Sequence, residues 1–215
     1  GRTWNRIPVK KGAHVVSITT DTVFDKGAGR VYIGTDGDFG LLAPQHRSPT
    51  PGRAQNISGD PTEEAPLPYG TLRYVSLLDR VPEITVAGSD TFYNKNFATV
   101  WNTHACPQGI FFNARSHLFV YNPNLAGTDR NELSVIHPSA LLKKGKKEIK
   151  DIKEIKDTTK TLTSNQQKFF RSFIFDDTLY IELRGMGILK YAHGETFNIL
   201  PGTEFITKMR GVHAL

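Results

Sequence analysis

The sequence predicts an all-β protein, a single β-sandwich domain over residues 1–215 with long surface loops. Short segments rich in β-branched and aromatic residues recur along the chain, and glycine, proline, asparagine and aspartate turns separate them. The 19 Gly and 12 Pro residues favour many turns over long helices. No repeat of fixed length is present, which argues against a propeller or a solenoid. Two packed sheets would suit this composition.

The expected strands begin with residues 13–20, a β-branched segment bounded by Gly12 and a turn at Asp21. They continue at 30–33, 69–78, 81–87, 91–93, 98–101, 110–121, 132–136, 169–175, 178–184, 188–191, 197–200 and 204–207. The segments on either side of Asp176-Asp177 form the clearest hairpin. The stretch from Asn96 to Asn124 is the densest apolar region, with one tryptophan, five other aromatic rings and the only cysteine.

Three segments fall outside this strand pattern. Residues 1–12 mix basic residues with Trp4 and Pro8, and we expect a basic arm. Residues 41–68 are rich in proline, which removes backbone donors and fixes φ. They are expected as a long surface loop that contacts a neighbouring subunit or a receptor. Residues 143–160 hold eight lysines and four acidic residues, and are expected as a solvated excursion or one short amphipathic helix.

The net charge of +6 indicates a mild attraction for polyanions, although ordinary surface charge would also explain it. The candidates for contact with nucleic acid are the arm residues Arg2, Arg6, Lys10 and Lys11. A second candidate polyanion contact consists of Lys143, Lys144, Lys146 and Lys147. Interleaved acidic residues favour a solvent-facing loop for this second group.

No catalytic motif is present, so we expect no enzyme, no metal site and no cofactor. The P-loop, GxGxxG and GxSxG patterns are absent, and the seven histidines show no HExxH or comparable spacing. His104 and Cys106 would share one face of an extended strand, but a buried structural cysteine is the commoner case. A hydrolase alternative would bring dispersed carboxylates such as Glu182 into a cleft. The chain also lacks the apolar run of ~18 residues that a membrane helix needs, so no membrane insertion is expected.

The rings of the central stretch allow two interpretations. Trp101, Phe119 and Tyr121 could form an aromatic platform for bases or sugars, or lie at an interface. In an all-β chain such rings more often fill the core.

Two groups of short motifs carry a family resemblance. The turn Ala105-Cys106-Pro107-Gln108-Gly109 runs into Ile110-Phe111-Phe112 and is followed by Asn122-Pro123-Asn124-Leu125. Further on lie the hairpin from Phe173 to Arg184 and the segment Phe197-Asn198-Ile199-Leu200-Pro201. These segments resemble the late region of the capsid proteins of parvoviruses, including densoviruses. The resemblance runs from Asn96 to the C-terminus, with an interruption at residues 143–160.

The resemblance implies a viral jelly roll that assembles with copies of itself into an icosahedral shell around single-stranded DNA. It also implies a host surface receptor as a partner. The chain would lie in the virion, and in the host nucleus or cytoplasm during assembly. It departs from the family in its short length, and it lacks a glycine-rich N-terminal tract and a phospholipase motif. Two alternatives stay open: a β-sandwich module that binds carbohydrate or a cell surface, and the β-rich hydrolase.

Overall fold

The computed structural model describes residues 6–9, 12–24, 29–44, 72–82, 95–127, 132–138, 168–184, 187–192 and 197–203. Their regular structure is mainly strand, and it includes two single-turn 3-10 helices, η1 (Leu78–Arg80) and η2 (Pro123–Leu125). The prediction of an all-β protein is therefore confirmed. Among these residues, no helix is long and apolar enough to cross a membrane.

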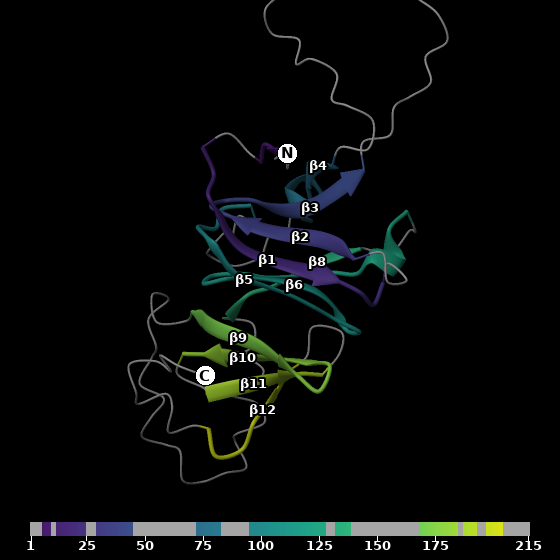
Figure 1. The fold of residues 1–215 in the computed structure, drawn as a ribbon. Coiled ribbons are helices and arrows are strands. Elements are labelled where there is room, and N and C mark those ends of the chain that lie inside the picture. The colour runs from purple at the N-terminus through teal and green to yellow at the C-terminus, as the bar shows by residue number, and fades with distance from the viewer. Residues whose placement is uncertain are drawn as a thin grey trace, which may run out of the picture.

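The strands form three antiparallel sheets of four strands each (Figure 1). The N-terminal sheet consists of β1 (Val15–Asp21), β2 (Arg30–Thr35), β3 (Phe39–Pro44) and β4 (Leu72–Ser76). The central sheet consists of β5 (Val100–Cys106), β6 (Gly109–Ala114), β7 (Leu118–Tyr121) and β8 (Leu133–Ile136). The C-terminal sheet consists of β9 (Phe169–Phe175), β10 (Thr178–Leu183), β11 (Gly187–Tyr191) and β12 (Phe197–Ile199).

Each sheet is a meander in which strands pair with their neighbours in sequence. A jelly roll would also pair strands that are distant in the chain. Such pairs are not among the ladders of the described residues. The structure therefore shows an antiparallel all-β architecture, but the described strands do not show the pairing that defines a jelly roll.

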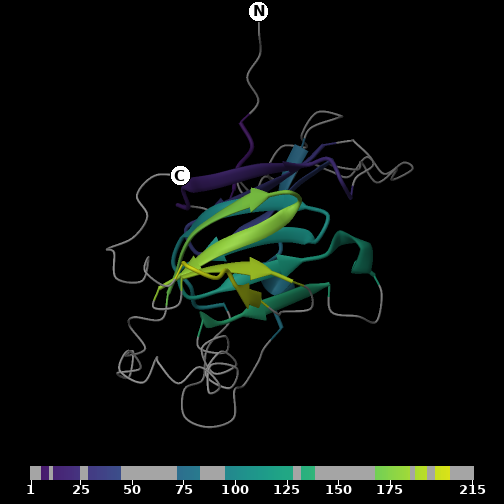
Figure 2. The same ribbon diagram turned by 90° about the horizontal axis from the view of Figure 1, so that it is seen from below.

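The central sheet lies between the other two sheets (Figures 1 and 2). Every residue of β6 and β7 is buried. Phe112 and Phe119 face the N-terminal sheet, whereas Phe111 and Leu118 face the C-terminal sheet. A strand that is buried on both faces needs apolar residues at successive positions, which explains the continuous apolar sequence here. The expectation of two packed sheets was wrong, because a third sheet covers the second face of the central one.

Two separate cores result from this stacking. The first lies between the N-terminal and central sheets and includes Tyr32, Phe39, Leu41, Val100, Ile110, Phe112, Phe119, Tyr121, Leu133 and Val135. The second lies between the central and C-terminal sheets and includes Cys106, Phe111, Leu118, Val120, Ile136, Phe169, Leu179, Ile181, Leu183, Leu189 and Tyr191.

Several element boundaries differ from the expected ones. The segment 110–121 divides into β6 and β7, because Ala114 and His117 exchange backbone hydrogen bonds across a tight turn. The proline-rich loop was expected from residue 41, but residues 41–44 complete β3 and pair with β4, and Leu41 also pairs with β2. The rest of that loop lies outside the described residues, as do residues 83–87, 91–93, 143–160 and 204–207.

The β9–β10 hairpin forms where the sequence predicted it. Phe175 pairs with Thr178, so Asp176 and Asp177 are the two turn residues. Both have positive φ, at 46° and 53°. A two-residue turn with positive φ at both positions matches the right-handed twist of the flanking strands, and aspartate tolerates that conformation better than most residues.

Candidate functional site

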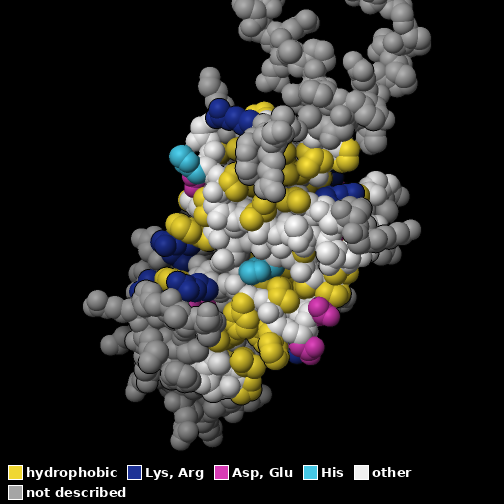
Figure 3. All heavy atoms as spheres, in the orientation of Figure 1, with side chains coloured by type: hydrophobic (Ala, Val, Ile, Leu, Met, Phe, Trp, Pro, Cys, Tyr) yellow, Lys and Arg dark blue, Asp and Glu magenta, His cyan; other side chains and the backbone are white. Residues whose placement is uncertain are grey.

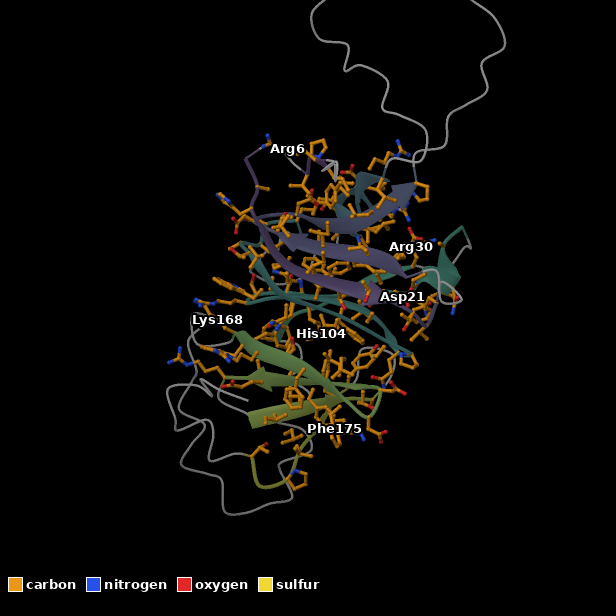
Figure 4. All side chains as sticks on the ribbon, viewed as in Figure 1. Arg6, Asp21, Arg30, His104, Lys168 and Phe175 are labelled. Carbon is orange, nitrogen blue, oxygen red and sulfur yellow. The ribbon has the colours of Figure 1, made fainter. Side chains whose placement is uncertain are left out.

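The predicted site residues have different outcomes. Arg6 is exposed near the described N-terminal end (Figure 4), whereas Arg2, Lys10 and Lys11 lie outside the described residues. The lysines Lys143, Lys144, Lys146 and Lys147 also lie outside them. Phe119 and Tyr121 are buried in the first core. The interpretation of these two rings as an aromatic platform was therefore wrong, and both rings fill the core. Trp101 remains accessible, at 48% exposure.

The exposure of Trp101 has a backbone cause. The register between β5 and β6 shifts between Val100 and Asn102, which places Trp101 in a β-bulge. Val100 is fully buried in the first core. Bulges re-aim single side chains and occur often next to functional sites. Here the bulge leaves a large indole ring at the surface.

A second bulge lies in β9. Ile181 pairs with Ser172 and Leu183 pairs with Phe169, so Phe170 and Arg171 together oppose the single residue Glu182. Phe169 and Ser172 are buried, whereas Phe170 is half-buried and Arg171 is exposed. The bulge therefore turns Phe170 away from the second core.

The two bulges meet at a basic–aromatic cluster, which consists of Trp101, Arg115, Phe170 and Arg184. The Arg115 guanidinium carbon lies 5.3 Å from the centre of the Trp101 ring and 6.0 Å from that of Phe170. The Arg184 guanidinium carbon also lies 6.0 Å from the Phe170 ring. Cations at such distances are attracted to the negative faces of aromatic rings. The cluster thus alternates ring, cation, ring and cation.

Backbone hydrogen bonds fix the elements that carry the cluster. The Phe169 N–H donates to the Arg115 carbonyl at 2.8 Å, and the Arg184 N–H donates to the Lys168 carbonyl at 3.1 Å. Lys168 therefore flanks the cluster at the start of β9, where Figure 4 labels it. Figure 3 shows Lys and Arg side chains gathered at this edge of the molecule.

Glu182 of β10 lies opposite Phe170 and Arg171 of β9 in the sheet register, and it is largely buried. A backbone hydrogen bond joins Arg184 to Lys168. In the described part of the chain, neither Arg115 nor Arg184 forms an ion pair with a carboxylate. Among the described residues, the cluster therefore carries two guanidinium charges.

A polar group joins the central and C-terminal sheets near this edge. His104 Nε2 lies 3.0 Å from both the carbonyl oxygen and the hydroxyl oxygen of Ser172, and Figure 4 places His104 between the two sheets. Since a carbonyl only accepts, Nε2 carries the proton. The Asn113 amide donates to the Ser172 hydroxyl at 3.0 Å and to the Phe170 carbonyl at 2.8 Å. These bonds hold β9 against β5 and β6.

The structure favours a buried structural Cys106 over a His104–Cys106 pair. Burial raises the pKa of the Cys106 thiol, although the backbone N–H groups of Gln108 and Gly109 partly oppose this. A raised pKa disfavours the thiolate, which is the nucleophilic form. His104 is engaged by Ser172 instead.

The two aspartates of the β2–β3 turn serve the fold. Asp36 accepts a hydrogen bond from the Thr99 hydroxyl at 2.6 Å, and Asp38 accepts from the Phe39 N–H and the Ser76 hydroxyl, both at 2.7 Å. No group of three potential metal ligands exists among the described residues.

The histidines at the sheet interfaces predict acid sensitivity. Burial lowers the pKa of His104, and the bond to the Ser172 carbonyl offsets part of this effect. Burial also lowers the pKa of His137. Above about pH 6.5 the imidazoles are neutral in both the folded and unfolded states. Below about pH 6.5 the imidazoles take up protons more readily in the unfolded state than in the folded state. The free energy of unfolding therefore decreases as the pH falls, by at most about 1.4 kcal/mol per histidine and pH unit.

Urea unfolding at pH 7.5 and pH 5.5 measures this effect. The variant His104→Gln should lose less stability on acidification than the natural chain, because the amide can still donate to Ser172 and does not titrate. His14→Gln is the matched control, since His14 is exposed. An equal loss of stability in the two variants would contradict the prediction.

The sequence pattern did not single out three of the four cluster residues. Arg115, Phe170 and Arg184 come from separate segments, and the signal available was Arg115 interrupting an apolar run. Only the packing of β9 against β6 brings them together.

Comparison with protein-family models, with curated proteins and with solved structures finds no match to this chain.

Proposed function

We propose that this chain is a structural subunit of a virus shell that self-associates around nucleic acid. The observation that carries the proposal is the exposed apolar surface of β1. Val15, Val16 and Ile18 are 51%, 38% and 62% exposed on this edge strand of the N-terminal sheet. Exposed apolar residues on an edge strand favour association with another chain. A second copy is the occupant expected for a shell subunit.

Two further features support a structural role. Phe175 at the tip of the β9–β10 hairpin is 67% exposed, and the hydrophobic atoms visible in Figure 3 lie over β1–β3 and again over the C-terminal sheet. The polar contact between His104 and Ser172 joins two strands of different sheets. The positive basic–aromatic cluster suits a polyanionic cargo.

The jelly roll belongs to this proposal as the architecture that the capsid resemblance implies. The observed meanders share its antiparallel β-sandwich character. Assembly through the exposed apolar side chains of β1 does not depend on the order in which the strands are connected.

Replacing Ile18 with aspartate should abolish or strongly weaken assembly. The change places a charge in the apolar β1 surface, and loss of a central interface contact costs about 2 kcal/mol or more. Light scattering after size-exclusion chromatography and negative-stain microscopy measure the effect. Asn96→Asp is the matched control, because Asn96 is exposed outside β1 and the substitution adds the same charge. A natural chain that stays monomeric at high concentration would refute the proposed function.

A further inference from the structure

We propose that the basic–aromatic cluster binds single-stranded nucleic acid. An unpaired base would stack on the exposed Trp101 ring, and the guanidinium groups of Arg115 and Arg184 would contact phosphates. The inference rests on the proposed function for the identity of the cargo. It assigns the contact to a folded surface between the central and C-terminal sheets, instead of to the basic arm or to residues 143–160.

The order of groups in the cluster matches the chemistry of a single strand. The Arg115 guanidinium lies near two rings, at 5.3 Å from Trp101 and 6.0 Å from Phe170, and the Arg184 guanidinium lies 6.0 Å from Phe170. A single strand likewise alternates flat bases with anionic phosphates. Proteins that bind such strands combine aromatic stacking surfaces with a positively charged path for the backbone.

The groups are accessible and held in place. Trp101 is about half exposed, Arg115 and Arg184 are exposed, and Phe170 is half-buried. The two bulges, the Phe169–Arg115 backbone bond and the Ser172 polar group fix the strands beneath them. A site that is rigid before binding loses less conformational entropy when the ligand binds.

The rings favour a single strand over a duplex. In a duplex the base faces are stacked on one another and cannot reach a protein ring, whereas unpaired bases can. The two guanidinium groups of the cluster favour a phosphate backbone over a neutral ligand.

Fluorescence anisotropy with a fluorescein-labelled oligodeoxythymidylate tests the assignment. Trp101→Ala should weaken binding by about 5- to 150-fold, the range for loss of one base-stacking ring. Arg115→Ala and Arg184→Ala should also weaken binding. Each should reduce the slope of log affinity against log salt by about 0.7, because each removes one phosphate contact to a single strand. Trp101→Ala should leave that slope unchanged.

The matched controls lie on the outer face of the same sheet. Phe175 is an exposed ring, and the Lys190 ammonium lies 6.0 Å from the Tyr180 ring, so Phe175→Ala and Lys190→Ala repeat both kinds of change outside the cluster. They should retain natural affinity. Arg115→Lys keeps the charge but loses the planar group, and should bind between the natural chain and Arg115→Ala. Thermal unfolding of each variant identifies any loss that comes from misfolding.

Three results would overturn the inference. The first is equal affinity of Trp101→Ala and the natural chain for the oligonucleotide. The second is equal loss in the cluster and control variants. The third is competition by heparin, or by a DNA duplex, as effective as that by unlabelled oligodeoxythymidylate.

Microscopy of the same variants separates this inference from the proposed function. Particles that form without any cluster-dependent binding of the oligonucleotide would refute the inference and leave the shell subunit standing. Cluster-dependent binding by a chain that never assembles would refute the shell subunit and leave the binding site standing.

Discussion

Replacing Phe39 with alanine should lower the free energy of unfolding by about 3–5 kcal/mol, the range for truncating a fully buried phenylalanine. The Phe39 ring is fully buried at the centre of the first core. Its centroid lies 4.5 Å from that of Phe119, 4.6 Å from Phe112 and 5.8 Å from Phe97. The substitution would remove contacts between the N-terminal and central sheets. Such a loss is a large share of the stability of a typical domain.

Denaturant unfolding measures this loss, when the curves of the natural chain and the variant are fitted with one common dependence of the free energy of unfolding on denaturant concentration. Phe175→Ala is the control, because that ring is 67% exposed and surface substitutions usually change stability by less than about 0.5 kcal/mol. If the two variants lost the same stability, Phe39 would not have the central position described.

Replacing Gly40 with alanine should cost about 2–3 kcal/mol, because β3 has no space for a side chain at this position. A Cβ atom there would collide with the Val75 backbone carbonyl and would lie 2.9 Å from atoms of the Tyr74 ring. Val75 and Tyr74 belong to β4, which pairs with β3, so relief requires the two strands to separate.

Gly37 in the same hairpin provides the control. It has a φ of 68°, but no atom lies within 4 Å of a Cβ built there. Gly37→Ala should cost about 1 kcal/mol from its left-handed backbone alone. Thermal or urea unfolding of both variants compares the cost of lost space with the cost of strained φ. A smaller loss for Gly40→Ala than for Gly37→Ala would contradict the close packing of β3 against β4.

Local signals in the sequence were enough for most of the strands. The β9–β10 hairpin could be predicted because its alternation and its Asp176-Asp177 turn lie within one short segment. The position of β3 could not, because Phe39 and Gly40 look like part of a glycine-rich turn until β2 and β4 pair with them.

Of the candidate site, the sequence predicted an accessible aromatic ring, and it did so correctly only at Trp101. Trp101 was considered as part of an aromatic platform, and it is exposed. Phe119 and Tyr121 were considered with it, and both are buried. The alternation of a strand gives the two faces of a sheet, but it does not say whether each face meets solvent or another sheet.

The sequence by itself determined the all-β class, the main hairpin and the apolar character of the central strands, since each depends on residues close together in the chain. Tertiary structure alone decided that a third sheet covers the central sheet, and that two bulges bring Trp101 and Phe170 to the surface. It also decided that the guanidinium groups of Arg115 and Arg184 both lie near the Phe170 ring. Such convergence depends on the packing of distant strands, which local propensity does not encode.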